Sequence, residues 1–103
     1  MPALAPGGTS QPPLILTIDA GSSSTRALLF DAQGESLPAV GAHEAHLLHT
    51  AQDGAVEDDP DAAVERIARC IDGVLTQAGP LASQIAGVAV DTYVSNLLAV
   101  DAT

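Results

Sequence analysis

Two short apolar runs, separated by a few small polar residues, constrain the fold of this chain more than any other feature of its sequence. The first run is Leu14 to Ile18 and the second is Thr25 to Phe30. Each has the length of a strand, and the link between them is tight and polar, so together they predict a β-hairpin. The dipeptide Gln33-Gly34 after the second run indicates another turn.

The next stretch, Ser36 to Leu48, is less regular. Pro38 and Gly41 disfavour a long helix there, and we expect a third, edge-like strand. The following residues, "AQDGAVEDDP" from 51 to 60, are rich in Asp and Gly and are expected to form a loop.

A single amphipathic helix follows this loop. Its apolar residues recur at steps of three and four, and its start and end carry clear signals. Asp59 is placed to cap the helix, Pro60 suits its first position, and Gly79-Pro80 ends it. Glu65 and Arg69 are spaced to form a pair along its surface. The apolar face consists of Val64, Ile67, Ala68, Ile71, Val74, Leu75 and Ala78.

Two further strands are expected after the helix. The segment Ile85 to Asp91 has apolar residues at positions that would point to either face of a strand, as in a strand covered on both faces of its sheet. Asn96 to Ala102 is interpreted as a last strand. The order is therefore strand, strand, strand, helix, strand, strand, which predicts an α/β fold.

The overall composition limits the class of protein. A length of 103 residues allows at most one domain. With 13 acids, 3 basic residues and a formal charge of -10, the chain should repel nucleic acid and anionic membrane surfaces. One cysteine, Cys70, and the lack of a signal peptide or membrane span favour the cytoplasm. Residues 1–13, rich in Pro, Gly, Ser and Thr, are expected to be a flexible tail.

The link between the first two strands has the residues of a phosphate-binding turn. Asp19 ends the first strand and offers a hard oxygen ligand for Mg²⁺. Gly21 permits close approach of the backbone, the hydroxyls of Ser22 to Ser24 can donate to phosphate oxygens, and Arg26 adds a positive charge. The alternative is that these small polar residues only make a good hairpin turn.

The stretch "DAGSSSTR" resembles the first phosphate motif of the FGGY carbohydrate kinases, within the actin, Hsp70 and sugar kinase superfamily. "GAVEDDPDA" (54–62) is similar to the segment that precedes the family's first helix, and "IAGVAVDTYVSNLLAVDA" (85–102) is similar to the strands after it. The "VDT" resembles the gluconokinase-like members. The resemblance implies that residues 14–103 are the N-terminal portion of the first domain, an incomplete, ribonuclease H-like (actin-like ATPase) half-domain with a mixed sheet.

The family resemblance also implies an activity and its residues. The enzyme would transfer the γ-phosphoryl group of ATP, with Mg²⁺, to a hydroxyl of a sugar or sugar acid. Asp19 would then be the metal-linked acid, and Ser22, Ser23, Ser24 and Arg26 would contact the nucleotide phosphates. The general-base Asp and the adenosine motif are expected beyond Thr103, so we expect this chain to be inactive alone.

The family's sugar contacts fall on Thr92, Tyr93, Val94, Ser95 and Asn96. Here Val94 and Ser95 replace the Arg-Glu or Met-His pairs of glycerol and xylulose kinases, which leaves the substrate open. Asp91 would either hold a sugar hydroxyl or cap the next turn. The missing flanking elements also imply that the fragment exposes apolar surface and associates with itself. Whether the chain is a fragment, a truncated reading frame or a complete small protein is open.

Other candidate sites are weaker. His43, His46 and His49 share a spacing that would align metal ligands on a helix, but on a strand they are expected to be surface or loop residues. The acids Asp53, Glu57, Asp58, Asp59 and Asp61 lack the spacing of a calcium loop, and a solvated face and helix cap are preferred. Cys70 is expected to be a half-buried small hydrophobe and not a nucleophile.

Two alternative functions remain at this point. One is another ATPase of the same superfamily, of the chaperone or dehydratase-activator type, and the other is a non-catalytic interaction module. The "VEDDP" segment and Arg26 favour the kinase over the first, and the scarcity of aromatic residues, 2%, disfavours the second.

Overall fold

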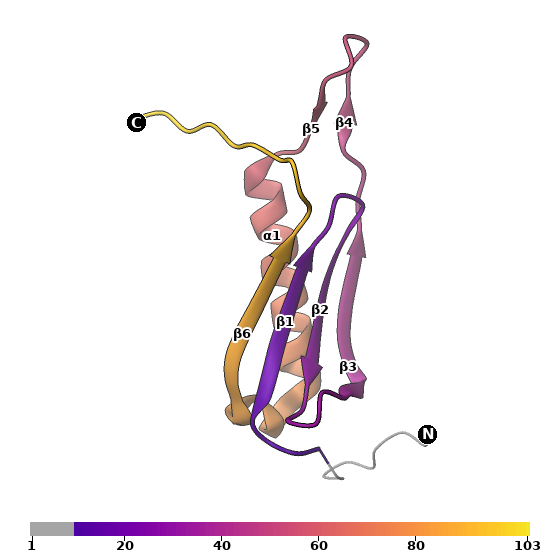
Figure 1. Ribbon diagram of the computed structural model, residues 1–103, viewed down its shortest axis with the longest axis vertical. Helices are drawn as coiled ribbons and strands as arrows, with labels where there is room; N and C mark the ends of the chain where they lie inside the picture. The colour runs from indigo at the N-terminus through magenta and orange to yellow at the C-terminus, as the bar shows by residue number, and fades with distance from the viewer. Residues whose placement is uncertain (1–9) are drawn as a thin grey trace.

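A computed structural model describes residues 10–103, and its main element is a mixed sheet of four strands (Figure 1). The strands are β1 (Leu14–Ala20), β2 (Ser24–Phe30), β3 (Ser36–Ala45) and β6 (Ile85–Thr92), in the order β3-β2-β1-β6. β1 pairs antiparallel with β2 and parallel with β6, while β2 pairs antiparallel with β3. The predicted hairpin and the edge position of the third strand are confirmed.

The single α-helix, α1 (Pro60–Ala78), begins and ends where the sequence predicts. An Asp59 carboxylate oxygen accepts a hydrogen bond from the backbone N of Asp61 at 2.9 Å, which satisfies one of the free donors at the helix start. Gly79 follows the helix with a positive φ of 55°. A 3₁₀-helix, η1 (Gly79–Gln84), then leads into β6.

The core lies between α1 and one face of the sheet. Because side chains alternate along a strand, β1 contributes residues 14, 16 and 18 to this face and β2 contributes 25, 27 and 29. Leu14, Leu29 and Val74 are fully buried where helix and sheet meet. Cys70 packs against β2 as a small hydrophobe, with its Sγ 3.6 Å from the carbonyl oxygen of Thr25, and at 2% exposure it is more deeply buried than predicted.

β6 departs from its prediction because it is not covered on both faces by residues 10–103. α1 lies over β2 and β3 and makes fewer contacts with β1, so the helix-side residues of β6 have no layer above them. Val88 and Val90 are accordingly 59% and 63% exposed. The prediction of a strand here is confirmed, and the prediction that both of its faces are covered is wrong.

The strand expected at Asn96 to Ala102 does not form, and that prediction is wrong. β6 ends at Thr92, and Ser95 adopts a φ of 64°, which turns the chain away from the sheet edge (Figure 1). Without a neighbouring strand to pair with, the segment is irregular, and Leu97 is 97% exposed.

The loop expected at 51–60 contains additional structure. A two-stranded hairpin, β4 (His49–Thr50) and β5 (Val56–Glu57), extends beyond the end of the main sheet (Figure 1). Gly54 adopts a φ of 91° at its tip, a backbone conformation that favours glycine. Two-residue strands carry too little alternation to be recognised in a sequence, which explains why the hairpin is missed.

Candidate functional site

The turn between β1 and β2 is tight enough to require glycine at its first position. The backbone N of Gly21 donates to the carbonyl O of Ser24 at 2.8 Å. A Cβ at Gly21 would lie 2.9 Å from that same oxygen, closer than a side chain can approach. The Gly21 N–H is thus bonded within the turn. The lack of a side chain at Gly21 lets the carbonyl oxygen of Ser24 approach the backbone closely.

The three serines of this turn have free hydroxyl groups. Ser22 and Ser23 are exposed and Ser24 is partly exposed. None of their hydroxyls hydrogen bonds to another side chain or to the backbone within residues 10–103. Three potential donors therefore line one short turn at the end of β1.

Four charged or titratable residues lie in one row across the main sheet. In the strand register, Asp19 is opposite Arg26 on β2 and Asp91 on β6, and Arg26 is opposite His43 on β3. All four belong to the sheet face opposite α1, because their chain neighbours Ile18 and Ala27 are buried on the helix side. The structure thus brings Asp19 and Arg26 together beside the serine turn, with no ion pair between them among the described residues.

A cavity of about 760 Å³ lies next to this turn, where β1 and β6 end and α1 begins. The backbone N of Tyr93 donates to the carbonyl O of Ala20 at 3.2 Å, which ties the end of β6 to the start of the turn. Four of the five predicted sugar-contact residues line the cavity: Thr92, Tyr93, Ser95 and Asn96. Val94, which is 86% exposed, is not among the lining residues.

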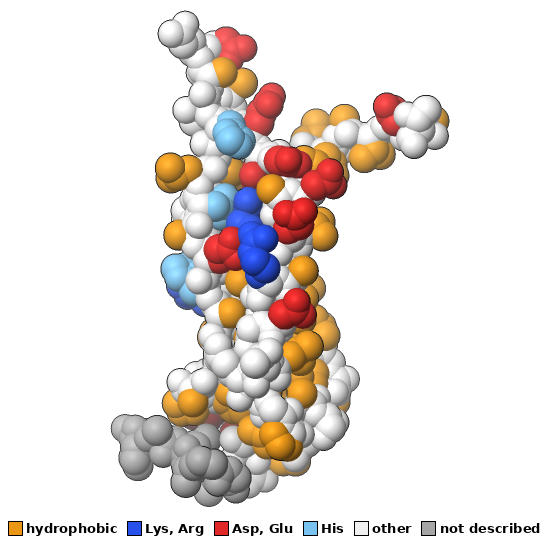
Figure 2. All heavy atoms as spheres, turned by 180° about the vertical axis from the view of Figure 1, so that it is seen from behind, with side chains coloured by type: hydrophobic (Ala, Val, Ile, Leu, Met, Phe, Trp, Pro, Cys, Tyr) orange, Lys and Arg blue, Asp and Glu red, His pale blue; other side chains and the backbone are white. Residues whose placement is uncertain are grey.

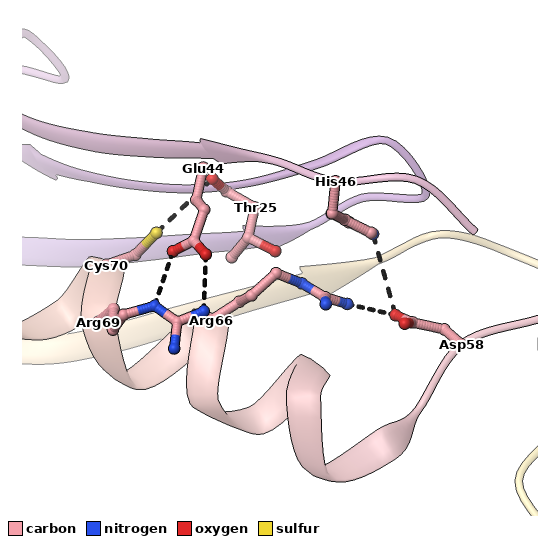
Figure 3. Close-up of polar contacts among 7 residues, drawn as sticks. All are labelled: Thr25, Glu44, His46, Asp58, Arg66, Arg69 and Cys70. Atoms are coloured by element: carbon pink, nitrogen blue, oxygen red, sulfur yellow. Dashed lines mark hydrogen bonds and ion pairs between the residues drawn. The ribbon is translucent and has the colours of Figure 1, made fainter. Parts of the chain in front are cut away.

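A buried polar cluster lies between α1 and the end of β3, close to the cavity (Figure 3). Arg66 Nη2 donates to Asp58 Oδ2, and His46 Nε2 lies 3.9 Å from the same oxygen. His46 lies in the loop after β3, one of its two predicted locations, but its side chain is only 8% exposed and so is not on the surface. Its backbone N also donates to the carbonyl O of Ser23 at 2.9 Å, which connects this cluster to the serine turn.

The three histidines do not form a common site. His43 and His49 are exposed, as predicted, while His46 is buried by α1. Within residues 10–103, no group of three or more His, Cys, Asp or Glu residues is arranged to hold a metal ion. A metal at this site would therefore need oxygen ligands from its substrate or from water in addition to Asp19.

Arg69 pairs across elements and not along its helix. Its Nε and Nη2 donate to the two carboxylate oxygens of Glu44 on β3, at 3.0 and 2.6 Å (Figure 3). This forked contact lowers the pKa of Glu44, because the guanidinium stabilises the charged carboxylate. The pair expected between Glu65 and Arg69 is not among the ion pairs of the described chain.

The acidic residues near α1 have separate structural roles. Asp59 caps the helix, and Asp58 belongs to the buried cluster with Arg66. Asp53 accepts from the backbone N of Ala55 in the β4–β5 hairpin.

Burial raises the pKa of the Cys70 thiol, which agrees with an unreactive core residue.

Comparison with known proteins identifies the family of this chain. Residues 14–103 match the FGGY family of carbohydrate kinases, N-terminal domain. A glycerol kinase from Citrifermentans bemidjiense is 41% identical over 76 residues, which cover 74% of this chain and 15% of the kinase. The crystal structure of gluconate kinase from Lactobacillus acidophilus matches with a TM-score of 0.58 and 19% identity, over 77% of this chain and 15% of that protein.

The structural match supports the sugar kinase fold, a mixed sheet with one helix as part of an actin-like half-domain. The chain spans only 15% of the length of the glycerol kinase that it resembles. No helix within residues 10–103 has the length and hydropathy needed to cross a membrane. On the family match and the relative's sequence identity, this chain belongs to the FGGY family of carbohydrate kinases, in the N-terminal domain of that family.

Proposed function

We propose that this chain supplies the first phosphate-binding turn of a kinase that transfers the γ-phosphoryl group of ATP to a hydroxyl of a sugar or related compound. The observation that carries this proposal is the turn from Gly21 to Ser24, where three serine hydroxyls make no hydrogen bond within residues 10–103. Asp19 and Arg26, opposite one another in the strand register, flank the turn. The family membership of the chain supports the same chemistry.

The proposed site can be divided by residue role. Ser22, Ser23 and Ser24 donate hydrogen bonds to phosphate oxygens, and Arg26 offsets phosphate charge. The exposed carboxylate of Asp19 fits a Mg²⁺ ion held together with phosphate oxygens and water, because Mg²⁺ commonly binds through one or two carboxylates. When bound, Mg²⁺ would neutralise the charge that develops on the phosphates.

The acceptor is proposed to bind in the adjacent cavity. The Tyr93 to Ala20 hydrogen bond keeps the cavity wall next to the phosphate turn, so a ligand in the cavity would lie near that turn. The two relatives are named as a glycerol kinase and a gluconate kinase, which supports an acceptor of the polyol or sugar-acid class.

The remaining parts of the reaction are proposed to come from other segments. Family membership and the 15% coverage of the glycerol kinase suggest that the general-base Asp and the adenosine site are not within residues 14–103. Residues 14–103 are proposed to be the N-terminal portion of the first kinase domain. Its partners are then ATP and a sugar, with no role for nucleic acid or a membrane, and its compartment is the cytoplasm, which suits the free Cys70.

The proposal is tested by titrating Mg²⁺ and ATP into the ¹⁵N-labelled chain and recording amide shifts. We expect saturable shifts at residues 21–24 that require Mg²⁺ and weaken in Asp19→Asn, while Asp72→Asn, an exposed helix change, behaves as the parent. Shifts that are absent, or that are the same in Asp19→Asn, would contradict the proposed site.

We also expect no ATP consumption dependent on glycerol or gluconate, since much of the rate in phosphoryl transfer depends on positioning both reactants.

A further inference from the structure

The charges around the cavity differ from those that a sugar acid would require. Two carboxylates, Glu57 and Asp58, are the charged side chains among its lining residues. None of the three arginines lines it. Arg66 and Arg69 are paired with Asp58 and Glu44, and Arg26 belongs to the opposite face of the sheet.

Asp58 is held in a fixed orientation by the buried cluster behind the cavity wall. Its Oδ2 accepts from Arg66, with His46 Nε2 on the same side, and its side chain is 12% exposed (Figure 3). Its Oδ1 accepts no hydrogen bond within residues 10–103. A buried carboxylate with one oxygen engaged retains acceptor capacity on the other, and a charged acceptor forms a stronger hydrogen bond than a neutral one.

The rest of the cavity wall is apolar or neutral. Thr92, Tyr93, Ser95 and Asn96 offer neutral polar groups, while Leu48, Ile67, Leu97 and Leu98 offer apolar surface. The volume of about 760 Å³ lies within the range of small-molecule sites, ~300–1,000 Å³. In the view of Figure 2, acidic side chains gather over the upper part of the face that α1 covers, around one group of basic side chains.

We propose, on the basis of the kinase function above, that this cavity selects a neutral polyol or sugar over a sugar acid, and that Asp58 accepts a hydrogen bond from one hydroxyl of that ligand. A hydroxyl donates directly to the carboxylate. A carboxylate ligand instead meets Glu57 and Asp58, with no cationic side chain among the lining residues to pair with it. A like-charge contact at partial solvent exposure disfavours the anionic ligand, and we expect discrimination of about tenfold or more.

Tyr93 provides the measurement, because it is the only tyrosine of a chain that has no tryptophan, and it lines the cavity. Glycerol, D-glucitol and sodium D-gluconate are titrated into the 103-residue chain at matched ionic strength, and Tyr93 fluorescence is recorded. We expect saturable binding of a neutral polyol and at least tenfold weaker binding of gluconate. Equal or tighter binding of gluconate, or no saturable change with any of the three, overturns the proposal.

Two variants separate charge from folding. Glu57→Gln removes one cavity charge from an exposed side chain that is not part of the buried Asp58–Arg66 pair. This variant should keep the fold and reduce the ratio of polyol affinity to gluconate affinity. Asp58→Asn should weaken polyol binding and improve gluconate binding, because it leaves the Arg66 charge without its partner. Asp61→Asn makes the same charge change on an exposed side chain that does not line the cavity, and its selectivity should equal that of the parent. A Glu57→Gln chain with unchanged selectivity also overturns the proposal.

The Mg²⁺ and ATP titration distinguishes failure of this inference from failure of the kinase proposal. Nucleotide shifts at residues 21–24 together with a preference for gluconate would refute only the selectivity of the cavity. Polyol binding without any nucleotide shift would refute the kinase function and retain the cavity assignment.

Discussion

Asp19 is exposed at the end of β1, in register with Arg26 and Asp91. Its carboxylate has two possible roles there, which are to bind Mg²⁺ or only to stabilise the turn. If it holds Mg²⁺ in the proposed site, Asp19→Asn in a full-length kinase that contains this chain should lower kcat by on the order of a hundredfold or more, the scale of one well-placed electrostatic group. The Kd for the sugar should change little. Turnover measured against Mg²⁺ concentration, alongside the melting temperature, tests this. A destabilised variant with normal turnover would show that Asp19 serves only the turn.

Asp31 gives the chain a pH dependence that can be assigned to one side chain. Its Oδ1 accepts from the backbone N of Glu35 at 3.0 Å and of Gln33 at 2.9 Å, and these bonds hold the pKa of the carboxyl below its ordinary value. The unfolded chain therefore binds its proton first as the pH falls. Stability from Asp31 is complete above the ordinary pKa, about 4, and is lost as the pH drops through the lower folded value.

We expect the free energy of unfolding in urea to fall between about pH 5 and pH 2, within the range where carboxyl groups titrate. In Asp31→Asn this fall should be shallower, since that charge is gone. Asp72→Asn, on the exposed side of α1, should retain the parent's slope. Parallel pH curves for parent and Asp31→Asn would show that the turn bonds do not depend on the charge.

At the scale of elements, α1 depends on its cap. Asp59→Ala removes the acceptor for the Asp61 N–H and should destabilise the chain by about 1 kcal/mol. Asp59→Ser supplies another capping oxygen and should recover most of that loss. Urea unfolding followed by circular dichroism compares the three chains. An alanine variant as stable as the serine variant would indicate that the Pro60 start and tertiary packing are sufficient for the helix.

The contacts of α1 also connect the two proposed sites. The helix buries Arg66 against Asp58 of the cavity wall and, one turn further along the same side, pairs Arg69 with Glu44 of β3. His46 extends the first contact to the serine turn through its backbone bond to Ser23. One helix thereby fixes the cavity wall and the turn relative to the same sheet.

At the scale of the whole molecule, the exposed side of β6 should promote self-association. Val88 and Val90 on this edge strand, together with Leu97, Leu98 and Val100 after it, expose apolar side chains, and an open strand edge can pair with another chain. We expect light scattering to report oligomers at high protein concentration. Val90→Lys should shift the population towards monomer, while Val94→Lys, outside the sheet, should do so less. A monomeric parent at all concentrations would contradict this expectation, and the charge of -10 acts in that direction.

The amino-acid sequence by itself determined the features that depend on neighbours along the chain. The β1–β2 hairpin follows from two apolar runs and a short link. The helix α1 begins after its cap Asp59 and ends before Gly79, because capping and chain reversal are local interactions. The "DAGSSSTR" motif likewise indicated the family that the comparisons established. Of the proposed site, the sequence could name Asp19, the serines and Arg26, since they occupy one short stretch.

Only the tertiary structure decided which groups meet across elements. His46 is buried because α1 lies over the end of β3, and Arg69 pairs with Glu44 and not with Glu65 for the same reason. β6 is exposed because no layer of the described chain lies over its helix-side face, and residues 96–102 are irregular because no strand of it lies beside them. An apolar sequence pattern does not show which layers and strands will be adjacent. The acidic cavity with Asp58 in its wall arises where β1, β6 and the start of α1 converge, because residues far apart in the chain share a surface only after packing.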